Sequence, residues 1–377
     1  MRYFTHGYKP FGSIIGHIIF LTCWLVGISL IQPEIAPSQA HATQFYVAFP
    51  RNNYTEEGRY LTGTKIFIAS SDGTIFQQLT ESGVFSQEFY PQWSQDGVRI
   101  AYMYHSPSAT QLRLYNLKND EMTILAEHSG QLIRWSPNER YISLYDGRYQ
   151  LSIYDMQQSS LSFLIEGMPG EWSPDSEFLA IRVGSFEHEN IAIIRPDGTG
   201  YRLLTNDEYH NIAHAWSPDG QNIYFRSNRT GNWDIYRMDI DGTNLMLLTQ
   251  TDRDESSLLL SPDGRWIAYT VPYGHPSLNP RPKILYVMDP DRSNVIEVLP
   301  AGVYYDFQWL PDSSGIVFYM QTETEDYKPP VYMLAWLDLA CLDTESGCNS
   351  EDIQFIPNTE TIGEIYPFDI YMPSHSE

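Results

Sequence analysis

The chain has 377 residues, of which 42% are hydrophobic and 19% charged, a composition that is typical of a globular protein and argues against collagen, coiled-coil or low-complexity chains. Its net charge of −24 argues against nucleic acid as a partner, because a strongly acidic surface repels phosphate backbones. Aromatic residues make up 14%, and 25 glycines with 24 prolines supply many turns, so we expect short strands and an all-β fold.

The first 42 residues are typical of an export segment. Arg2 and Lys9 precede an uncharged apolar run at residues 13–31, which is about as long as a bilayer-spanning helix. Ala40-His41-Ala42 has the small-x-small pattern of a signal peptidase site. We predict that residues 1–42 form a helical signal peptide, or an uncleaved transmembrane anchor with its spacer. Residues 43–377 then lie outside the cytoplasm, whether periplasmic, secreted or membrane-anchored, and touch a membrane only through that helix.

A five-residue motif recurs through the rest of the chain. It reads Trp-Ser-Gln-Asp-Gly at residues 93–97 and Trp-Ser-Pro-Asp-Gly at residues 216–220, and related copies begin at residues 135, 172, 260 and 309. This spacing is the period of a four-stranded propeller blade. Serine, proline, aspartate and glycine favour a tight turn, and the recurring tryptophan is interpreted as packing between blades.

The motif predicts six blades, and the two ends of the chain predict a seventh. Before Trp93 lie three strand-like runs, at residues 45–49, 65–69 and 75–79, but no inner strand. Residues 365–368 near the C-terminus resemble residues 89–92 and supply the missing strand. We therefore predict a seven-bladed propeller over residues 43–377, closed by a C-terminal strand, with six blades as the alternative.

Two cysteines near the C-terminus, Cys341 and Cys348, are close enough in sequence to pair in an oxidising compartment. The CxxC spacing of redox or zinc sites is absent from the sequence. We predict a structural disulfide, with a pair of free thiols as the alternative.

The best-preserved repeat resembles a known family. Residues 216–220, the run Ser-Asn-Arg-Thr-Gly-Asn-Trp-Asp-Ile-Tyr at 227–236, and residues 238–249 are similar to the TolB-type β-propeller repeat. The resemblance extends over nearly all of residues 43–377 and implies the fold rather than one function, because the repeat occurs in TolB, in prolyl oligopeptidase-type proteases and in other envelope proteins. Strands begin near residue 44 and the chain ends with the closing strand, so neither TolB's colicin-linked and lipoprotein-linked role nor peptidase activity is carried over.

No catalytic motif is present in the sequence. It lacks the G-x-S-x-G, H-E-x-x-H and P-loop patterns, and the acidic turn at residues 239–242 lacks the further ligands of a calcium loop. We therefore predict no catalytic residues, no cofactor and no metal.

The candidate binding residues are histidines and tyrosines in the loops expected on one face of the propeller. That face receives the loops between second and third strands and those between an outer strand and the next inner strand, and rigid scaffolds commonly present ligand sites on such loops. The residues are Tyr54, His105, His188, Tyr209, His210, Tyr273, His275 and Tyr327.

The expected function is a non-catalytic, extracytoplasmic binding or scaffold propeller that engages a protein, peptide or glycan on this face. One alternative is a metal-dependent carbohydrate lyase of the pectate type, in which histidines from different blades would hold the ion. Another is a subunit of a membrane-anchored envelope assembly, which an uncleaved N-terminal helix would favour.

Overall fold

The computed structural model describes most of the chain after residue 43: residues 44–54, 61–81, 83, 85–127, 130–185, 188–275, 281–322, 330–344, 347–362 and 367–373. The predicted helix within residues 1–42 lies outside these ranges. No helix in the described ranges is both long and apolar enough to cross a bilayer.

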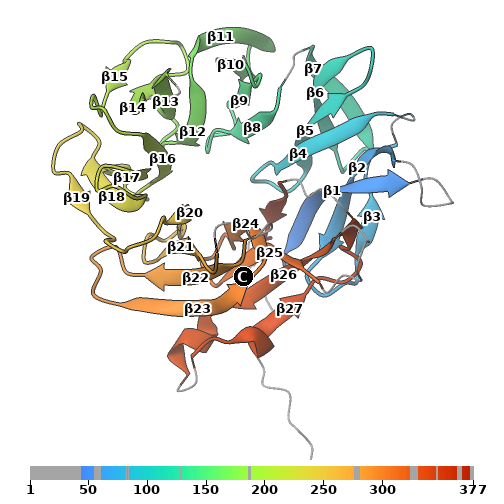
Figure 1. The fold of residues 1–377 in the computed structure, drawn as a ribbon. Helices are drawn as coiled ribbons and strands as arrows, with labels where there is room; N and C mark the ends of the chain where they lie inside the picture. The colour runs from blue at the N-terminus through green and yellow to red at the C-terminus, as the bar shows by residue number, and fades with distance from the viewer. Residues whose placement is uncertain are drawn as a thin grey trace, which may run out of the picture. The chain divides into compact units, whose positions relative to one another are not determined.

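Seven antiparallel sheets are arranged in a ring as blades I to VII, so the seven-bladed prediction is confirmed and the six-bladed alternative is wrong (Figure 1). The strands of blades I to III, inner strand first, are β29 (Asp369–Tyr371), β1 (Tyr46–Tyr54), β2 (Leu61–Ser70), β3 (Phe76–Gln78); β4 (Gln87–Trp93), β5 (Arg99–His105), β6 (Thr110–Asn116), β7 (Glu121–Glu127); and β8 (Leu132–Trp135), β9 (Tyr141–Tyr145), β10 (Gln150–Asp155), β11 (Ser160–Glu166).

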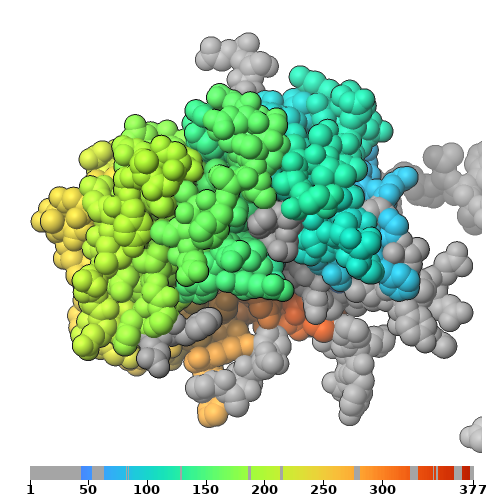
Figure 2. Space-filling model, turned by 90° about the horizontal axis from the view of Figure 1, so that it is seen from above, coloured from blue at the N-terminus to red at the C-terminus, as the bar shows by residue number. Residues whose placement is uncertain are grey.

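The remaining four blades follow in chain order, and Figure 2 shows successive blades side by side along the rim. Blades IV and V contain β12 (Met168–Trp172), β13 (Leu179–Ser185), β14 (His188–Ile194), β15 (Arg202–Leu203); and β16 (Asn211–Trp216), β17 (Asn222–Ser227), β18 (Asp234–Asp239), β19 (Met246–Leu247). Blades VI and VII contain β20 (Ser256–Leu260), β21 (Ile267–Pro272), β22 (Lys283–Met288), β23 (Val295–Gly302); and β24 (Tyr304–Trp309), β25 (Gly315–Gln321), β26 (Val331–Asp338), β27 (Ile353–Phe355), with β28 (Thr361–Ile362) also paired to β26.

The repeated motif forms the turn between the first two strands of a blade. In blade V the Ser217 hydroxyl accepts a hydrogen bond from the Asn222 amide at 2.8 Å, and the Asp219 carboxylate accepts one from the Gln221 amide at 3.0 Å. Gly220 has a φ of +69°, in the left-handed region that glycine tolerates best. The motif therefore satisfies the backbone of a tight turn with its own side chains.

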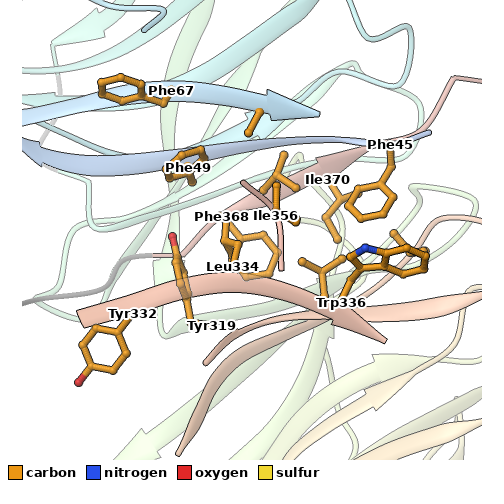
Figure 3. Close-up of a cluster of buried hydrophobic side chains, with 14 residues drawn as sticks. Phe45, Phe49, Phe67, Tyr319, Tyr332, Leu334, Trp336, Ile356, Phe368 and Ile370 are labelled. Atoms are coloured by element: carbon orange, nitrogen blue, oxygen red, sulfur yellow. The ribbon is translucent and has the colours of Figure 1, made fainter. Parts of the chain in front are cut away.

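Blade I is built from both ends of the chain, as predicted. β29 pairs antiparallel with β1, and Val47 lies opposite Ile370. The paired residues lie just beyond the predicted run at 365–368, of which residues 365 and 366 are outside the described ranges. Phe368 precedes the strand and is buried against Tyr319 of blade VII, with the ring centroids 5.4 Å apart (Figure 3). This pairing closes the ring and covers the edge of β1.

The recurring tryptophans link neighbouring blades, which supports their interpretation as packing residues. They are largely buried, and at four boundaries the indole N–H donates to a backbone carbonyl of the preceding blade. These bonds are Trp135 to Gln92 (3.2 Å), Trp172 to Arg134 (3.3 Å), Trp216 to Glu171 (2.9 Å) and Trp309 to Leu259 (3.3 Å).

A disulfide joins Cys341 to Cys348 after β26, as predicted. The bridged segment begins with the short 3-10 helix η1 (Leu339–Asp343), and a second one, η2 (Ser350–Asp352), leads into β27. Cys341 is buried against the core of blades VI and VII. The bridge therefore fixes the excursion that precedes the outer strand of blade VII.

Candidate functional site

The antiparallel topology gives the propeller two different faces. The loop face carries the connections between second and third strands and between successive blades, whereas the turn face carries the tight turns of the repeated motif. Among the predicted residues, the Tyr54 side chain and all of Tyr327 lie outside the described parts of the chain.

Two of the predicted histidines come together on the loop face across a blade boundary. His188 begins β14 of blade IV and His210 directly precedes β16 of blade V, and their ring centroids are 6.5 Å apart. The His210 ring also lies 6.1 Å from the Trp233 ring. His188 Nδ1 is 2.7 Å from the Glu208 carbonyl oxygen. We refer to His188, Glu189, His210 and Trp233 as the loop-face cluster.

Glu189 connects the cluster to two further side chains. Its carboxylate lies 3.1 Å from Arg182 Nε, accepts a hydrogen bond from the Tyr149 hydroxyl at 3.1 Å, and lies 3.7 Å from His210 Nδ1. Burial and the bond to Glu189 raise the pKa of Tyr149. The carboxylate therefore makes charge-assisted contacts with side chains of blades III and IV, and it lies next to His210 of blade V.

A cavity of about 610 Å³ opens beside Glu189 and is lined by Arg148, Tyr149, Met168 and Arg182 among others. Further along the face, the Arg226 guanidinium lies 5.2 Å from the Trp233 ring centroid. Aromatic faces next to cations and hydrogen-bonding groups suit a sugar ring or a peptide side chain. Glu189 belongs to both the cluster and the cavity lining, so the two are adjacent and together define the candidate site over blades III to V.

Tyr209 directly precedes His210 on the same loop and is exposed next to the cluster, whereas the remaining described candidates do not join it. His105 is half-buried, with Nε2 3.0 Å from the Gly130 carbonyl oxygen and its ring 5.8 Å from that of Phe89, and burial lowers its pKa. These contacts give it a packing role. Tyr273 and His275 are exposed and follow β21 in one connection of blade VI.

The larger hollow lies at the turn-face end of the central channel and was not predicted from the sequence. It has a volume of about 740 Å³, and its rim includes Pro137, Pro174, Pro218 and Pro262 of the repeated motif. Polar side chains from several inner strands line it: Gln92, Arg134, Glu171, Asp306, Gln308 and Asp369. The signal in the sequence is the residue just before each motif tryptophan, which is polar in several copies although a buried strand would favour an apolar one.

Two carboxyls in this hollow bind the backbone of neighbouring inner strands. Asp306 accepts a hydrogen bond from the Phe368 amide at 3.2 Å, and Asp369 accepts one from the Trp93 amide at 2.6 Å. Desolvation raises the pKa of Asp306 to about 6 and that of Asp369 to about 7. The channel carboxyls therefore link the closing strand to both of its neighbours, which is a structural role.

Metal binding by the histidines has little support in the geometry. The described residues include no group of three or more histidine, cysteine or acidic side chains placed to hold one ion. His188 and His210 are only two such ligands, and the Nδ1 atom of His188 already contacts a backbone carbonyl. The described donor set does not fit the three-ligand sites typical of catalytic transition metals.

Comparison with known proteins supports the fold. The model of the TolB beta propeller domain family matches residues 134–327, which is just over half of the chain. TolB from Acinetobacter baumannii is similar in structure, with a TM-score of 0.51 and 16% sequence identity over 87% of this chain and 66% of that protein. No curated protein matches the sequence.

Two enzymes have similar folds. An oligogalacturonate lyase in complex with manganese has a TM-score of 0.56 and 13% identity over 78% of this chain and 82% of that one. Oligogalacturonate lyase from Vibrio parahaemolyticus has a TM-score of 0.57 and 13% identity, covering 82% of this chain and 85% of that one. At these identities the similarity concerns the fold alone.

Proposed function

Because this chain belongs to the TolB β-propeller family, we propose that it is a non-catalytic binding or scaffold protein that acts outside the cytoplasm and engages a protein, peptide or glycan on its loop face. The observation that carries the proposal is the loop-face cluster, in which His188, His210 and Trp233 from two blades meet beside a cavity of about 610 Å³.

The chemistry of the cluster fits recognition better than covalent catalysis. Its one buried carboxylate, Glu189, is already engaged by Arg182 and Tyr149, so it is not placed as a free base. The rings of His210 and Trp233 offer stacking faces instead. The predicted export segment and the disulfide support a location outside the cytoplasm, where a disulfide persists.

The proposal is tested with two exposed tyrosines that differ in position. Tyr209 directly precedes His210, whereas Tyr201 is equally exposed but precedes the outer strand β15. The full chain, Tyr209→Ala and Tyr201→Ala are screened on glycan and peptide arrays, and hits are measured by calorimetry. We expect Tyr209→Ala to weaken binding about tenfold and Tyr201→Ala to leave it unchanged. Equal effects would contradict the loop-face assignment.

A metal-dependent carbohydrate lyase is the second candidate. It is favoured by the proximity of His188 to His210 and by the similar fold of the manganese-bound lyase. The test is elemental analysis of the purified chain together with a lyase assay on polyuronates. If the purified chain holds a stoichiometric transition metal that His210→Ala loses, the lyase replaces the binding propeller as the proposed function. If the chain holds no such metal, the lyase is excluded.

An envelope-assembly subunit is a third possibility that concerns the anchor rather than the binding face. N-terminal sequencing of the mature protein decides it. A mature chain that begins after Ala42 would leave the propeller free, whereas one that keeps residues 13–31 would be held at the membrane.

A further inference from the structure

Equivalent positions at three blade boundaries carry different charges. In each case a threonine hydroxyl after an outer strand accepts a hydrogen bond from a third-strand amide: Ile66 to Thr80 (3.1 Å), Ile191 to Thr205 (2.9 Å) and Ile235 to Thr249 (2.8 Å). The residues just before those amides are Lys65, Asn190 and Asp234.

The facing position belongs to the next blade and lies five residues before its motif. It is occupied by Glu88 in blade II, Asn211 in blade V and Glu255 in blade VI. Each boundary therefore brings together one residue from a third strand and one from the start of the next inner strand. We refer to these pairs as the boundary pairs.

At the boundary between blades I and II the pair is compensated. Lys65 is 6% exposed, Glu88 is 0% exposed, and the two interact electrostatically in the direction that favours the charged ammonium group. At the boundary between blades IV and V, Asn190 and Asn211 are both neutral, and Trp216 adds its indole bridge to Glu171.

At the boundary between blades V and VI the pair consists of two acids. Asp234 and Glu255 are both 0% exposed, and their carboxyls lie within hydrogen-bonding reach of each other. Asp234 Oδ1 and Glu255 Oε2 are buried and accept no hydrogen bond. The Arg226 guanidinium donates to the Glu255 carbonyl at 2.8 Å and interacts electrostatically with the Glu255 carboxyl, so one cation faces two acids. Burying the second negative charge is costly unless a further cation or a proton lies at the pair. This boundary also lacks the indole bridge, because Leu260 replaces the tryptophan of the motif.

The side-chain atoms next to this pair that could bind a cation are oxygens. Thr230 donates to Asp234, and Thr251 donates to Glu255 Oε1 at 2.8 Å. The Tyr236 hydroxyl is buried without a hydrogen-bond partner, and Tyr236 follows Asp234 by two residues on the same side of β18. Carboxylate and hydroxyl oxygens without nitrogen or sulfur ligands select a hard cation such as calcium.

We propose that Asp234 and Glu255 hold a calcium ion at the boundary between blades V and VI, in the role that the Lys65 ammonium group has between blades I and II. The ion would also stiffen the loop face, since the Trp233 amide donates to Asp254 at 2.9 Å and the Trp233 carbonyl accepts from the Glu255 amide at 2.7 Å. The site is independent of the ligand that the loop face binds.

The test uses the full chain after removal of divalent ions with a chelator. Calcium chloride is titrated by calorimetry, and thermal unfolding is followed with calcium, magnesium, sodium or potassium. We expect one calcium ion per chain and a rise in Tm of about 4 °C when free calcium is about 100 times its dissociation constant. Magnesium is expected to be weaker, because it requires a tighter octahedral shell.

Three variants locate the ion. Asp234→Asn with Glu255→Gln reproduces the neutral pair of blades IV and V, and Asp234→Lys reproduces the pair of blades I and II. Both are expected to fold and to lose the calcium response. Asp241→Asn, in an exposed turn of the same blade, is expected to keep it.

Two results would overturn the proposal. One is the absence of calcium binding at millimolar concentration, or binding that persists in both boundary variants. The other is a pH-dependent difference in Tm between the wild-type chain and the Asn/Gln variant that calcium leaves unchanged. That result would assign the pair a shared proton instead of an ion.

Discussion

The indole nitrogens of most motif tryptophans form hydrogen bonds between neighbouring blades. Trp135, Trp172, Trp216 and Trp309 each donate to a carbonyl of the preceding blade, whereas the Trp93 indole nitrogen is buried without a partner. The blade before Trp93 is the composite one, and there Tyr371 of the closing strand packs against the Trp93 ring, with the centroids 5.3 Å apart. The motif tryptophan therefore contributes both packing and a hydrogen bond at four boundaries, but packing alone at Trp93.

This difference predicts unequal effects of one substitution. Trp216→Phe removes ring volume and leaves the Glu171 carbonyl unpaired, so we expect it to lower the free energy of unfolding by about 2–4 kcal/mol. Trp93→Phe removes an indole group whose N–H is already unpaired, and we expect a loss of about 1–2 kcal/mol. Urea unfolding of both variants measures the difference. Equal losses would show that the indole bond contributes nothing.

For single residues, the sequence predicts where a side chain lies in a blade better than it predicts which side chain of the next blade it contacts. The recurrence of tryptophan every blade indicates packing between blades, and this is what the structure shows. Lys65, Asn190 and Asp234 each lie 15 residues before the threonine of their blade, so the repeat aligns them in the sequence. The sequence does not show that each of them meets the start of the next inner strand, because that contact depends on how neighbouring blades pack.

Among the elements, the strand that closes the ring, β29, is short. β29 pairs with β1 over three residues. It is supported by the buried side chains of Phe368 and Ile370, which pack between blades I and VII (Figure 3). The Tyr-Pro sequence near residue 366 predicted the strand, but not its register. In the structure Asp369 accepts a hydrogen bond from the Trp93 amide, 276 residues away in sequence, and a local pattern cannot indicate such a contact.

Removing the closing strand is expected to open the ring. A chain that ends at residue 366 loses β29 and exposes the edge of β1, so we expect a much lower Tm and concentration-dependent aggregation. A chain that ends at residue 373 keeps β29 and is the control. Scattering and thermal unfolding measure both, and an unchanged Tm in the shorter chain would contradict closure by this strand.

The disulfide is expected to make a moderate contribution to stability. The bridge closes a loop of seven residues' separation, for which the chain-entropy relation gives about 2.5 kcal/mol. Cys341→Ser with Cys348→Ser is therefore expected to lower the free energy of unfolding by about that amount in urea titrations. A reducing agent should reproduce the loss in the wild-type chain and have no effect on the double variant. A reducing effect that persists in the variant would contradict this account.

In the molecule as a whole, ring closure creates surfaces that no single repeat shows. The loop face follows from strand order, so the histidines that meet there could be placed on one side of the fold from the sequence. The turn-face hollow could not, because Gln92, Arg134, Glu171 and Asp369 come from four different blades. Their positions beside the motif tryptophans are regular, but their convergence depends on the number of blades.

Opposite pKa shifts in two groups of aspartates predict that the chain is most stable in mildly acidic solution. Hydrogen bonds in the tight turns lower the pKa of Asp72 to about 2, so their stabilisation is present above about pH 4 and is lost as the pH falls towards 2. In the channel, desolvation raises the pKa of Asp306 to about 6 and of Asp369 to about 7. These two favour folding while protonated, and that advantage is lost as the pH rises from about 4 to 7.

We therefore expect the free energy of unfolding to fall by about 1–2 kcal/mol between pH 5 and pH 8, because the two channel carboxyls are partly exposed and channel water screens their charges. Asp306→Asn keeps an oxygen that can accept from the Phe368 amide but cannot ionise, so it should flatten this decline. Asp241→Asn, in an exposed turn, is the control and should keep it. Urea titrations at fixed ionic strength give the slopes. A wild-type free energy that rises over this interval would show that ionised channel carboxyls stabilise the ring.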